Sequence, residues 1–198
     1  MIRIGLTGVS GSGKSFVTKI FAQYGIPSVN SDAVVHELYG TKNSCTEALS
    51  QRFGMEILCE DHSVDRRKLA EIVFSSKEKL QLLNQTVHPF VTERIDMLAK
   101  AEELRGSKAF LIEAPQLFEA GLDATCNYIV SVVTDHETRI ERLTVRDGIT
   151  REMAENRIRN QHNDLFFREH SDFCIENSAQ DDLEQQVLFV LKELDLLI

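Results

Sequence analysis

Apolar and polar positions along the chain mark out five short strands separated by helices. The strands are expected at residues 2–6, 26–29, 109–112, 128–133 and 173–176. Those at 109–112 and 128–133 are apolar almost throughout, which is typical of strands covered on both faces of a parallel sheet. Helical periodicity follows the first strand at residues 14–24, which end at Gly25, and returns at residues 183–194. This order predicts an α/β fold, with a five-stranded parallel sheet and helices on both faces.

Two helical segments interrupt the alternation of strands and helices. Residues 34–105 lose the strand pattern and repeat apolar positions at helical spacing, which predicts a helical insertion between strands of one sheet. Residues 137–161 are also helical but break at Asp147 and Gly148, and Thr150 is placed to cap the helix that follows. A five-strand core enlarged by two helical segments accounts for the length of the chain.

Composition and charge describe an ordinary globular protein with one basic segment. The 198 residues carry a formal net charge of −9 and are 42% hydrophobic, enough to bury a core without disulfide or metal staples. Eight acids and one lysine lie in residues 169–198, whereas residues 139–159 hold six arginines against four acids. The acidic total argues against a nucleic-acid partner, and the arginine segment favours an anionic ligand. The four scattered cysteines are expected to be reduced and unliganded.

Neither a membrane span nor a signal peptide is expected. The longest apolar runs, such as residues 128–133, are far shorter than the roughly 20 residues that a helix needs to cross a bilayer. The chain starts directly in its first strand, without a basic region, an apolar stretch and a cleavage site in series. We therefore expect a cytoplasmic protein with no membrane partner.

A glycine-rich loop joins the first strand to the first helix. The sequence GVSGSGKS at residues 8–15 fits G-x-x-x-x-G-K-[ST] and stands in the required context. Glycines let successive backbone N–H groups turn toward phosphate oxygens, Lys14 reaches the β- and γ-phosphates, and the Ser15 hydroxyl is the expected Mg²⁺ ligand. The alternative, a Gly/Ser turn that contains a lysine by chance, is disfavoured by the context. The predicted nucleotide-binding residues of this loop are Gly8, Gly11, Ser12, Gly13, Lys14, Ser15 and, through its backbone N–H, Phe16.

Beyond the loop, the chain resembles the dephospho-coenzyme A kinases almost from end to end. The resemblance is carried by GLTG at 5–8 with the loop, NSDAVVH at 30–36, VDR at 64–66, AEIVF at 70–74, VHP at 87–89, PQLFE at 115–119, Arg142, Leu143, Arg146, Arg157, Gln161 and residues 172–177. Each segment is weak alone, but their order and spacing together are specific to this family.

The resemblance implies ATP-dependent phosphorylation of the ribose 3′-hydroxyl of dephospho-CoA, giving coenzyme A and ADP in the final step of coenzyme A biosynthesis. It implies a P-loop kinase core over residues 1–36, 106–138 and 163–198, with a helical substrate domain over 37–105 and a lid over 139–162. ATP and Mg²⁺ are then the cofactors and dephospho-CoA the partner, and we expect a monomer or a weak homo-oligomer.

Asp32 is the candidate catalytic base. It ends the second predicted strand, at the edge where open parallel sheets bind ligands. A carboxylate there can accept the proton of the attacking hydroxyl while Mg²⁺ and Lys14 neutralise the transferred phosphoryl group. The alternative is an aspartate in a turn or a helix cap. The family usually has Asp-x-Asp at this point, and Asn30 leaves this chain a single carboxylate.

Further metal and substrate residues follow from the resemblance, each with a structural alternative. Glu113 ends the third strand, where the family generally has an Asp that holds Mg²⁺. His88 precedes Pro89, which restricts its backbone and aims its ring into the substrate cleft, although a lone His is often structural. For the other candidates the alternative is a solvated helix surface or helix end. The full substrate set is Asp32, His36, Arg66, His88, Glu119 and Arg157.

The arginines of residues 139–162 are the candidate phosphate contacts of the lid. Guanidinium groups delivered by a closing segment stabilise charge on the phosphoryl oxygens and exclude water. Arg146 is the candidate catalytic contact, and Arg142 is a candidate for nucleotide binding. Asn177 is a candidate for the adenine. The alternatives are a solvated helix face, with Arg142 or Arg146 paired to Glu141, and a turn-forming Asn.

Two other functions are weighed against this one. Another P-loop kinase of small metabolites, acting on a nucleoside, gluconate or shikimate, is disfavoured by the long helical insertion with its Val-His-Pro. A GTPase-like switch is disfavoured because the chain contains no Asn-Lys-x-Asp motif for guanine. A catalytically silent kinase stays open because of Asn30 and Glu113.

Overall fold

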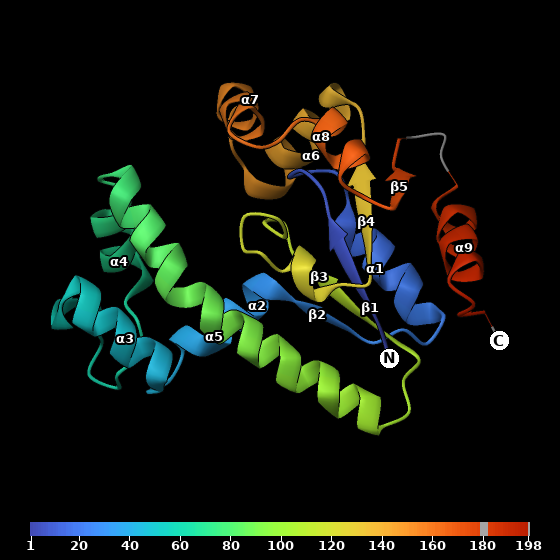
Figure 1. Ribbon diagram of the computed structural model, residues 1–198. Helices are drawn as coiled ribbons and strands as arrows, with labels where there is room; N and C mark the ends of the chain where they lie inside the picture. Colours follow the sequence, from blue (N-terminus) through green and yellow to red (C-terminus); the bar gives the residue numbers. More distant parts are fainter. Residues whose placement is uncertain (179–181, 198) are drawn as a thin grey trace. The chain divides into compact units, whose positions relative to one another are not determined.

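The computed structural model describes residues 1–178 and 182–197, and they group into two compact units. One unit comprises Met1–Ser28 and Glu102–Ile198, and the other comprises Val29–Ala101. The first holds the glycine-rich loop and the sheet, except for most of its second strand in the chain, and the second is otherwise helical (Figure 1). The functional division drawn from the sequence, with a substrate domain over 37–105 and a lid over 139–162, stays a prediction.

The chain forms a five-stranded sheet, in the strand order β2-β3-β1-β4-β5. β1 runs parallel to both β3 and β4, and β4 runs parallel to β5. The reversal of strand order around β1 opens a crevice at the carboxyl ends of the strands, which is where such sheets bind ligands. The strands are β1 (Ile2–Thr7), β2 (Ser28–Asn30), β3 (Ala109–Glu113), β4 (Tyr128–Val133) and β5 (Phe173–Glu176).

The predicted strands are confirmed, with one shift at the second. The sequence places that strand at residues 26–29, whereas β2 covers Ser28–Asn30. Pro27 has no N–H to donate, and its carbonyl oxygen accepts a hydrogen bond from the Leu111 N–H at 2.9 Å. The regular strand therefore begins one residue after the proline.

Helices cover both faces of this sheet, as predicted (Figure 1). On one face, Phe21 of α1 (Lys14–Gln23) and Val187 of α9 (Leu183–Glu193) pack in one apolar cluster with β-strand residues. On the other face, Phe167 of α8 (Asp164–Glu169) packs with Val9 and Val133. A short turn of helix, η2 (Asp123–Thr125), precedes β4.

A helical hairpin of α6 (His136–Asp147) and α7 (Arg151–Arg159) has a small core of its own. The core consists of Ile140, Leu143, Ala154 and Ile158, all buried. Gly148 ends α6 in the left-handed region, with φ of 64°, which is the usual conformation after a helix. The Thr150 hydroxyl accepts a hydrogen bond from the Met153 N–H at 3.3 Å, so the predicted cap is confirmed.

The second unit is helical, as the sequence predicts for this stretch. Pro89 lies inside α5, so the restriction that it places on the backbone of His88 does not end the helix, and the role of His88 in the substrate cleft stays a prediction. Val87 and Val91 on either side of it are buried, and packing of that helix face outweighs the hydrogen bond that the proline removes. The helices are α2 (Ser31–Tyr39), α3 (Ser44–Phe53), η1 (Met55–Ile57), α4 (Arg66–Val73) and α5 (Lys77–Leu104).

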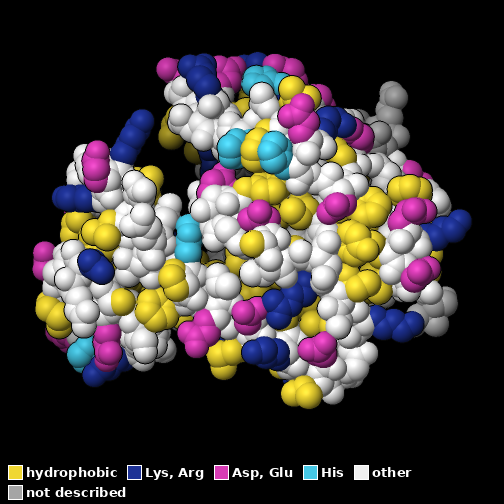
Figure 2. All heavy atoms as spheres, viewed as in Figure 1, with side chains coloured by type: hydrophobic (Ala, Val, Ile, Leu, Met, Phe, Trp, Pro, Cys, Tyr) yellow, Lys and Arg dark blue, Asp and Glu magenta, His cyan; other side chains and the backbone are white. Residues whose placement is uncertain are grey.

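Acidic and basic side chains are interspersed with small hydrophobic patches on the face drawn in Figure 2. Within the described part of the chain, no helix is both long enough and apolar enough to cross a membrane.

The cysteines differ in burial, and this predicts different reactivities. Burial raises the pKa of Cys45 and of Cys126 to about 11, whereas Cys59 is exposed. Because the thiolate is the reactive form, we expect a thiol-specific chromogenic reagent at pH 8 to label Cys59 first in the folded protein. The rate is measured by absorbance, and Cys59→Ser removes the fast phase. Labelling of Cys45 or Cys126 at the rate of Cys59 would contradict the burial.

Candidate active site

The glycine-rich loop leaves β1 and enters α1 through backbone conformations that favour glycine. Gly13 is the residue before α1 and has φ of 93°. A Cβ atom at Gly8 would lie 2.2 Å from the Val132 carbonyl oxygen, and one at Gly13 would lie 2.0 Å from Nδ2 of Asn177. Both positions therefore require glycine, because a neighbouring group lies where a Cβ atom would be and because φ is positive.

Several backbone N–H groups of the loop are available to a ligand. Those of Gly11, Gly13 and Ser15 have no hydrogen-bond acceptor among the described residues. They stand at the N-terminus of α1, which adds partial positive charge. The arrangement fits the predicted phosphate cradle except at Phe16, whose N–H donates to the Gly13 carbonyl oxygen at 3.0 Å.

Lys14 spans the inside of the loop. Its ammonium group donates to the Gly8 carbonyl oxygen at 2.8 Å and to the Val9 carbonyl oxygen at 3.2 Å, and the residue is buried. The next residue, Ser15, is exposed at the mouth. The loop thus holds a cation inside its curve and a hydroxyl group at its opening.

Arg142 and Asn177 brace the loop from the side. The Arg142 guanidinium donates to the carbonyl oxygens of Gly11 at 3.4 Å and Ser12 at 3.3 Å, and to that of Asn177 at 3.1 Å. Asn177 is buried, and its side-chain amide donates to the Ser12 carbonyl oxygen at 2.6 Å. These two predicted nucleotide-binding residues are thus brought together with the loop.

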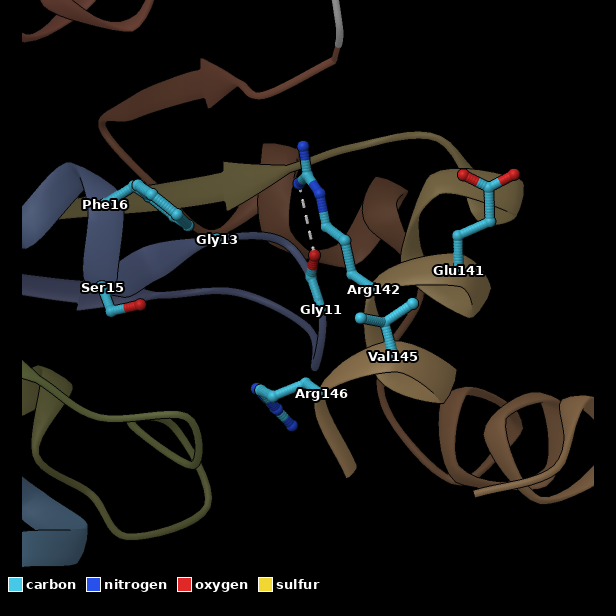
Figure 3. Close-up of a pocket in the computed structure, with 8 residues that line it drawn as sticks. All are labelled: Gly11, Gly13, Ser15, Phe16, Glu141, Arg142, Val145 and Arg146. Atoms are coloured by element: carbon cyan, nitrogen blue, oxygen red, sulfur yellow. Dashed lines mark hydrogen bonds between the residues drawn. The ribbon is translucent and has the colours of Figure 1, made fainter. Parts of the chain in front are cut away.

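A cavity of about 440 Å³ opens beside the loop, between it and α6 (Figure 3). Phe16, which is 63% exposed, and Val145, which is 86% exposed, provide apolar walls, and Arg142 and Arg146 provide charge. Such a mixture of apolar walls and cations suits a flat ring joined to an anionic group. The remaining lining residues are Gly11, Gly13, Ser15 and Glu141.

Asp147 holds the two other arginines predicted for the lid. Its carboxylate accepts hydrogen bonds from Arg146 Nε at 2.7 Å and Arg146 Nη2 at 2.9 Å, and from Arg157 Nη1 at 2.7 Å. Hydrogen bonds from Arg146, with the charges of both arginines, hold the pKa of the Asp147 carboxyl below its usual range. The pairing with Glu141 that the sequence left open is therefore replaced by pairing with Asp147.

Glu113 lies at the end of β3, against the first turns of α1. It is 8% exposed, and its Oε2 accepts a hydrogen bond from the Thr18 hydroxyl at 3.0 Å. The same hydroxyl donates to the Lys14 carbonyl oxygen at 3.1 Å. A carboxylate oxygen here and the Ser15 hydroxyl are the hard donors that Mg²⁺ prefers alongside phosphate oxygens. The described residues contain no cluster of three or more His, Cys, Asp or Glu that could hold a metal without such phosphates.

Glu119 lies beside a histidine. Its carboxylate lies 3.5 Å from Nε2 of His162, whose ring stacks on Phe166 with 3.7 Å between the ring centroids. Glu119 is exposed.

The second unit carries four of the predicted residues. The Asn30 side chain caps α2 by accepting from the Ala33 N–H at 3.1 Å, so Asp32 in the first turn is not the cap. Asp32 is exposed, and its carboxylate has no hydrogen-bond or ion-pair partner among the described residues. Nδ1 of His36 lies 2.9 Å from the Arg66 guanidinium, which brings these two together. His88 is half-buried on α5.

Sequence comparisons identify the family. The chain matches the model of the dephospho-CoA kinase family over residues 2–182. The chain belongs to the dephospho-CoA kinase family. Among curated dephospho-CoA kinases, that of Fusobacterium nucleatum is 37% identical over 185 residues, covering 93% of this chain and 94% of the relative. That of Arabidopsis thaliana is 38% identical over 192 residues, covering 96% of this chain and 83% of the relative.

Solved structures agree with membership of the dephospho-CoA kinase family. A dephospho-CoA kinase from Campylobacter jejuni has a TM-score of 0.68 at 26% identity, covering 97% of this chain and 96% of that one. A Thermus thermophilus protein has a TM-score of 0.79 at 33% identity, covering 98% and 97%. A shikimate kinase from Acinetobacter baumannii shares the P-loop kinase fold, with a TM-score of 0.55 at 16% identity. The match covers 98% of this chain and 93% of that one.

Four residues of this kinase site are absent from the sequence-based set. Val145 lines the cavity, Asp147 holds Arg146 and Arg157, Thr18 holds Glu113, and Gln161 contacts the loop. Val145 could have been found from the sequence, because it is an apolar residue three positions after Arg142 in a helix rich in charged residues. Asp147 pairs with its neighbour Arg146 and with Arg157 in the next helix. Thr18 and Gln161 act through hydrogen bonds between residues 95 and 151 positions apart, which no local pattern marks.

The close approach at Gly13 generates a prediction for the free energy of unfolding. Gly13→Ala has to displace Asn177 and break its hydrogen bond to Ser12. Gly106 has a similar φ of 87° with nothing near its Cβ position, so Gly106→Ala carries only the backbone strain of about 1–2 kcal/mol. We expect Gly13→Ala to cost at least about 1 kcal/mol more, measured by urea unfolding. An equal loss of unfolding free energy in the two variants would contradict the close packing of Asn177 against Gly13.

Proposed function

We propose that this chain catalyses the ATP-dependent phosphorylation of the ribose 3′-hydroxyl of dephospho-CoA, giving coenzyme A and ADP. The observation that carries the proposal is an intact phosphate loop, with free N–H groups and Lys14 inside it, in a chain that matches the family along residues 2–182. The charged cavity beside the loop supports ATP as the phosphoryl donor.

The loop and the arginines are proposed to hold and neutralise the triphosphate. Lys14 is assigned to the β- and γ-phosphates, where its ammonium exchanges loop carbonyls for phosphate oxygens. Arg146 is assigned to the transferred phosphoryl group, because its guanidinium lines the cavity and is held in one geometry by Asp147. Arg142, Phe16 and Asn177 are assigned to the adenosine end of the nucleotide.

Mg²⁺ is proposed to bind between Ser15 and Glu113. When bound, it neutralises charge on the β- and γ-phosphate oxygens. The Ser15 hydroxyl is exposed at the loop mouth, and Glu113 is oriented by Thr18. These two oxygen donors, with phosphate oxygens completing the set, suit a cation that seldom relies on protein ligands alone.

Asp32 is proposed as the base that accepts the proton of the attacking hydroxyl. Its carboxylate is exposed and unpaired among the described residues, so no cap or ion pair has to be broken before it accepts a proton. Asn30 fills the capping role next to it, which leaves the single carboxylate of Asp32 free for chemistry.

The substrate side is proposed to involve His36, Arg66, His88, Glu119 and Arg157. Arg66 and His36 form a hydrogen-bonded pair, which offers a basic group for the phosphates of dephospho-CoA. The protein is further proposed to act in the cytoplasm as a monomer or weak homo-oligomer, without nucleic acid.

A coupled ADP-release assay tests the substrate. With ATP and Mg²⁺ present, we expect dephospho-CoA to stimulate ADP release, and adenosine, gluconate and shikimate to leave it at the background rate. The product is identified as coenzyme A by mass spectrometry. Absence of stimulation by dephospho-CoA, or preference for shikimate, overturns the proposed function.

Substitution of Asp32 separates proton transfer from nucleotide binding. Asp32→Asn is expected to lower kcat by roughly 10²-fold or more and to leave ATP affinity unchanged, because the residue lies outside the loop. Lys14→Ala is expected to lose both turnover and tight ATP binding. Affinity is measured by calorimetry and turnover by ADP release. Near-normal turnover of Asp32→Asn would remove Asp32 from its role as base.

A further inference from the structure

A glutamine at the end of the α6–α7 hairpin is hydrogen-bonded to the phosphate loop at two points. Oε1 of Gln161 accepts from the Ser10 N–H at 2.9 Å, and its Nε2 donates to the Ser10 hydroxyl oxygen at 3.1 Å. Gln161 is itself fixed to α7, because its N–H donates to the Ile158 carbonyl oxygen at 3.1 Å. The side chain thus connects the last turn of α7 to the tip of the loop.

The primary amide of Gln161 matches the hydrogen-bonding groups of Ser10. Ser10 presents one donor, its N–H, and one acceptor, its hydroxyl oxygen, and a glutamine amide offers one acceptor and one donor in a plane. On the other side of the loop, Val9 is buried against Val133 and Phe167. Ser10 is therefore held between a buried neighbour and an amide clamp, which fixes the orientation of its peptide group.

The same hairpin reaches the loop a second time. Arg142 of α6 donates to the carbonyl oxygens of Gly11 and Ser12 at 3.4 and 3.3 Å. Ile158, whose carbonyl oxygen anchors Gln161, belongs to the small core that joins α6 to α7. Through Arg142 of α6 and Gln161 just after α7, the hairpin consequently contacts three successive loop residues, namely Ser10 at its N–H and Gly11 and Ser12 at their carbonyl groups.

We propose that Gln161 is a positioning residue that orders the phosphate loop for nucleotide and couples its shape to the α6–α7 hairpin. It acts through Ser10 and does not touch the reacting atoms. Without the clamp, the loop has to be ordered at the moment of binding, and that cost appears as weaker affinity. The inference concerns the nucleotide half of the proposed function, so it is tested on ADP alone, whose binding requires no phosphoryl acceptor.

The first test compares Gln161→Ala with Asn127→Ala. Asn127 is a matched control because its side-chain oxygen likewise accepts from a backbone N–H, that of Arg3 at 2.8 Å, at the start of β1 and away from the loop. With two hydrogen bonds lost, we expect Gln161→Ala to weaken Mg-ADP binding by about tenfold, measured by calorimetry, and to raise the KM for ATP more than it lowers kcat. Asn127→Ala is expected to lower the melting temperature without changing ADP affinity. Wild-type ADP affinity in Gln161→Ala, or an equal loss in Asn127→Ala, overturns the proposal.

The second test measures the loop directly and includes a milder variant. Amide hydrogen exchange at Ser10, followed by NMR without nucleotide, is expected to accelerate by about tenfold or more when Gln161 is replaced by Ala. Ser10→Ala removes only the bond to the hydroxyl and is expected to weaken ADP binding by about threefold. In the double variant Ser10→Ala, Gln161→Ala, affinity should equal that of Gln161→Ala alone, because both act through one contact. Unchanged exchange at Ser10, or additive losses in the double variant, would show that Gln161 has no positioning role. These outcomes stand whether or not dephospho-CoA is the acceptor.

Discussion

The buried hydrogen bonds beneath the phosphate loop are the constraint on which the rest of the site depends. The Ser12 carbonyl oxygen accepts from both Asn177 and Arg142, and Gly13 leaves no room for a side chain between them. Three segments far apart in sequence, namely the loop, α6 and the residue after β5, therefore have to be in place together. A buried polar group that loses its partner costs more than the bond contributes when formed, so this contact favours a single arrangement of the loop.

The loop and the cavity beside it are lined by positive charge, although the net charge of the chain is −9. Lys14 neutralises the inside of the loop, and Arg142 and Arg146 line the cavity. Asp147 partly neutralises the outer arginines and keeps them in fixed geometry. A phosphate that binds Arg146 as proposed has to compete with an existing carboxylate, and a triphosphate with several charges competes better than a single anion.

Much of the fold could be predicted because local signals agree with the final structure. The strands at 109–112 and 128–133 are apolar almost throughout, and the loop is a motif with a fixed context. Asn177 against the loop and Gln161 against Ser10 could not be predicted, since those partners are separated by 165 and 151 residues. The helix through Pro89 could be predicted, because the apolar positions of its buried face repeat at helical spacing. Packing of that face outweighs the local preference of the residue before a proline.

The exposed apolar walls of the cavity also have a thermodynamic consequence. Phe16 and Val145 stand largely in water, at 63% and 86% exposure. A flat ring seated between them removes apolar surface from water, and such burial carries a negative change in heat capacity. Nucleotide binding at this site should therefore become more exothermic as the temperature rises, with a slope that depends on the side chain at position 16.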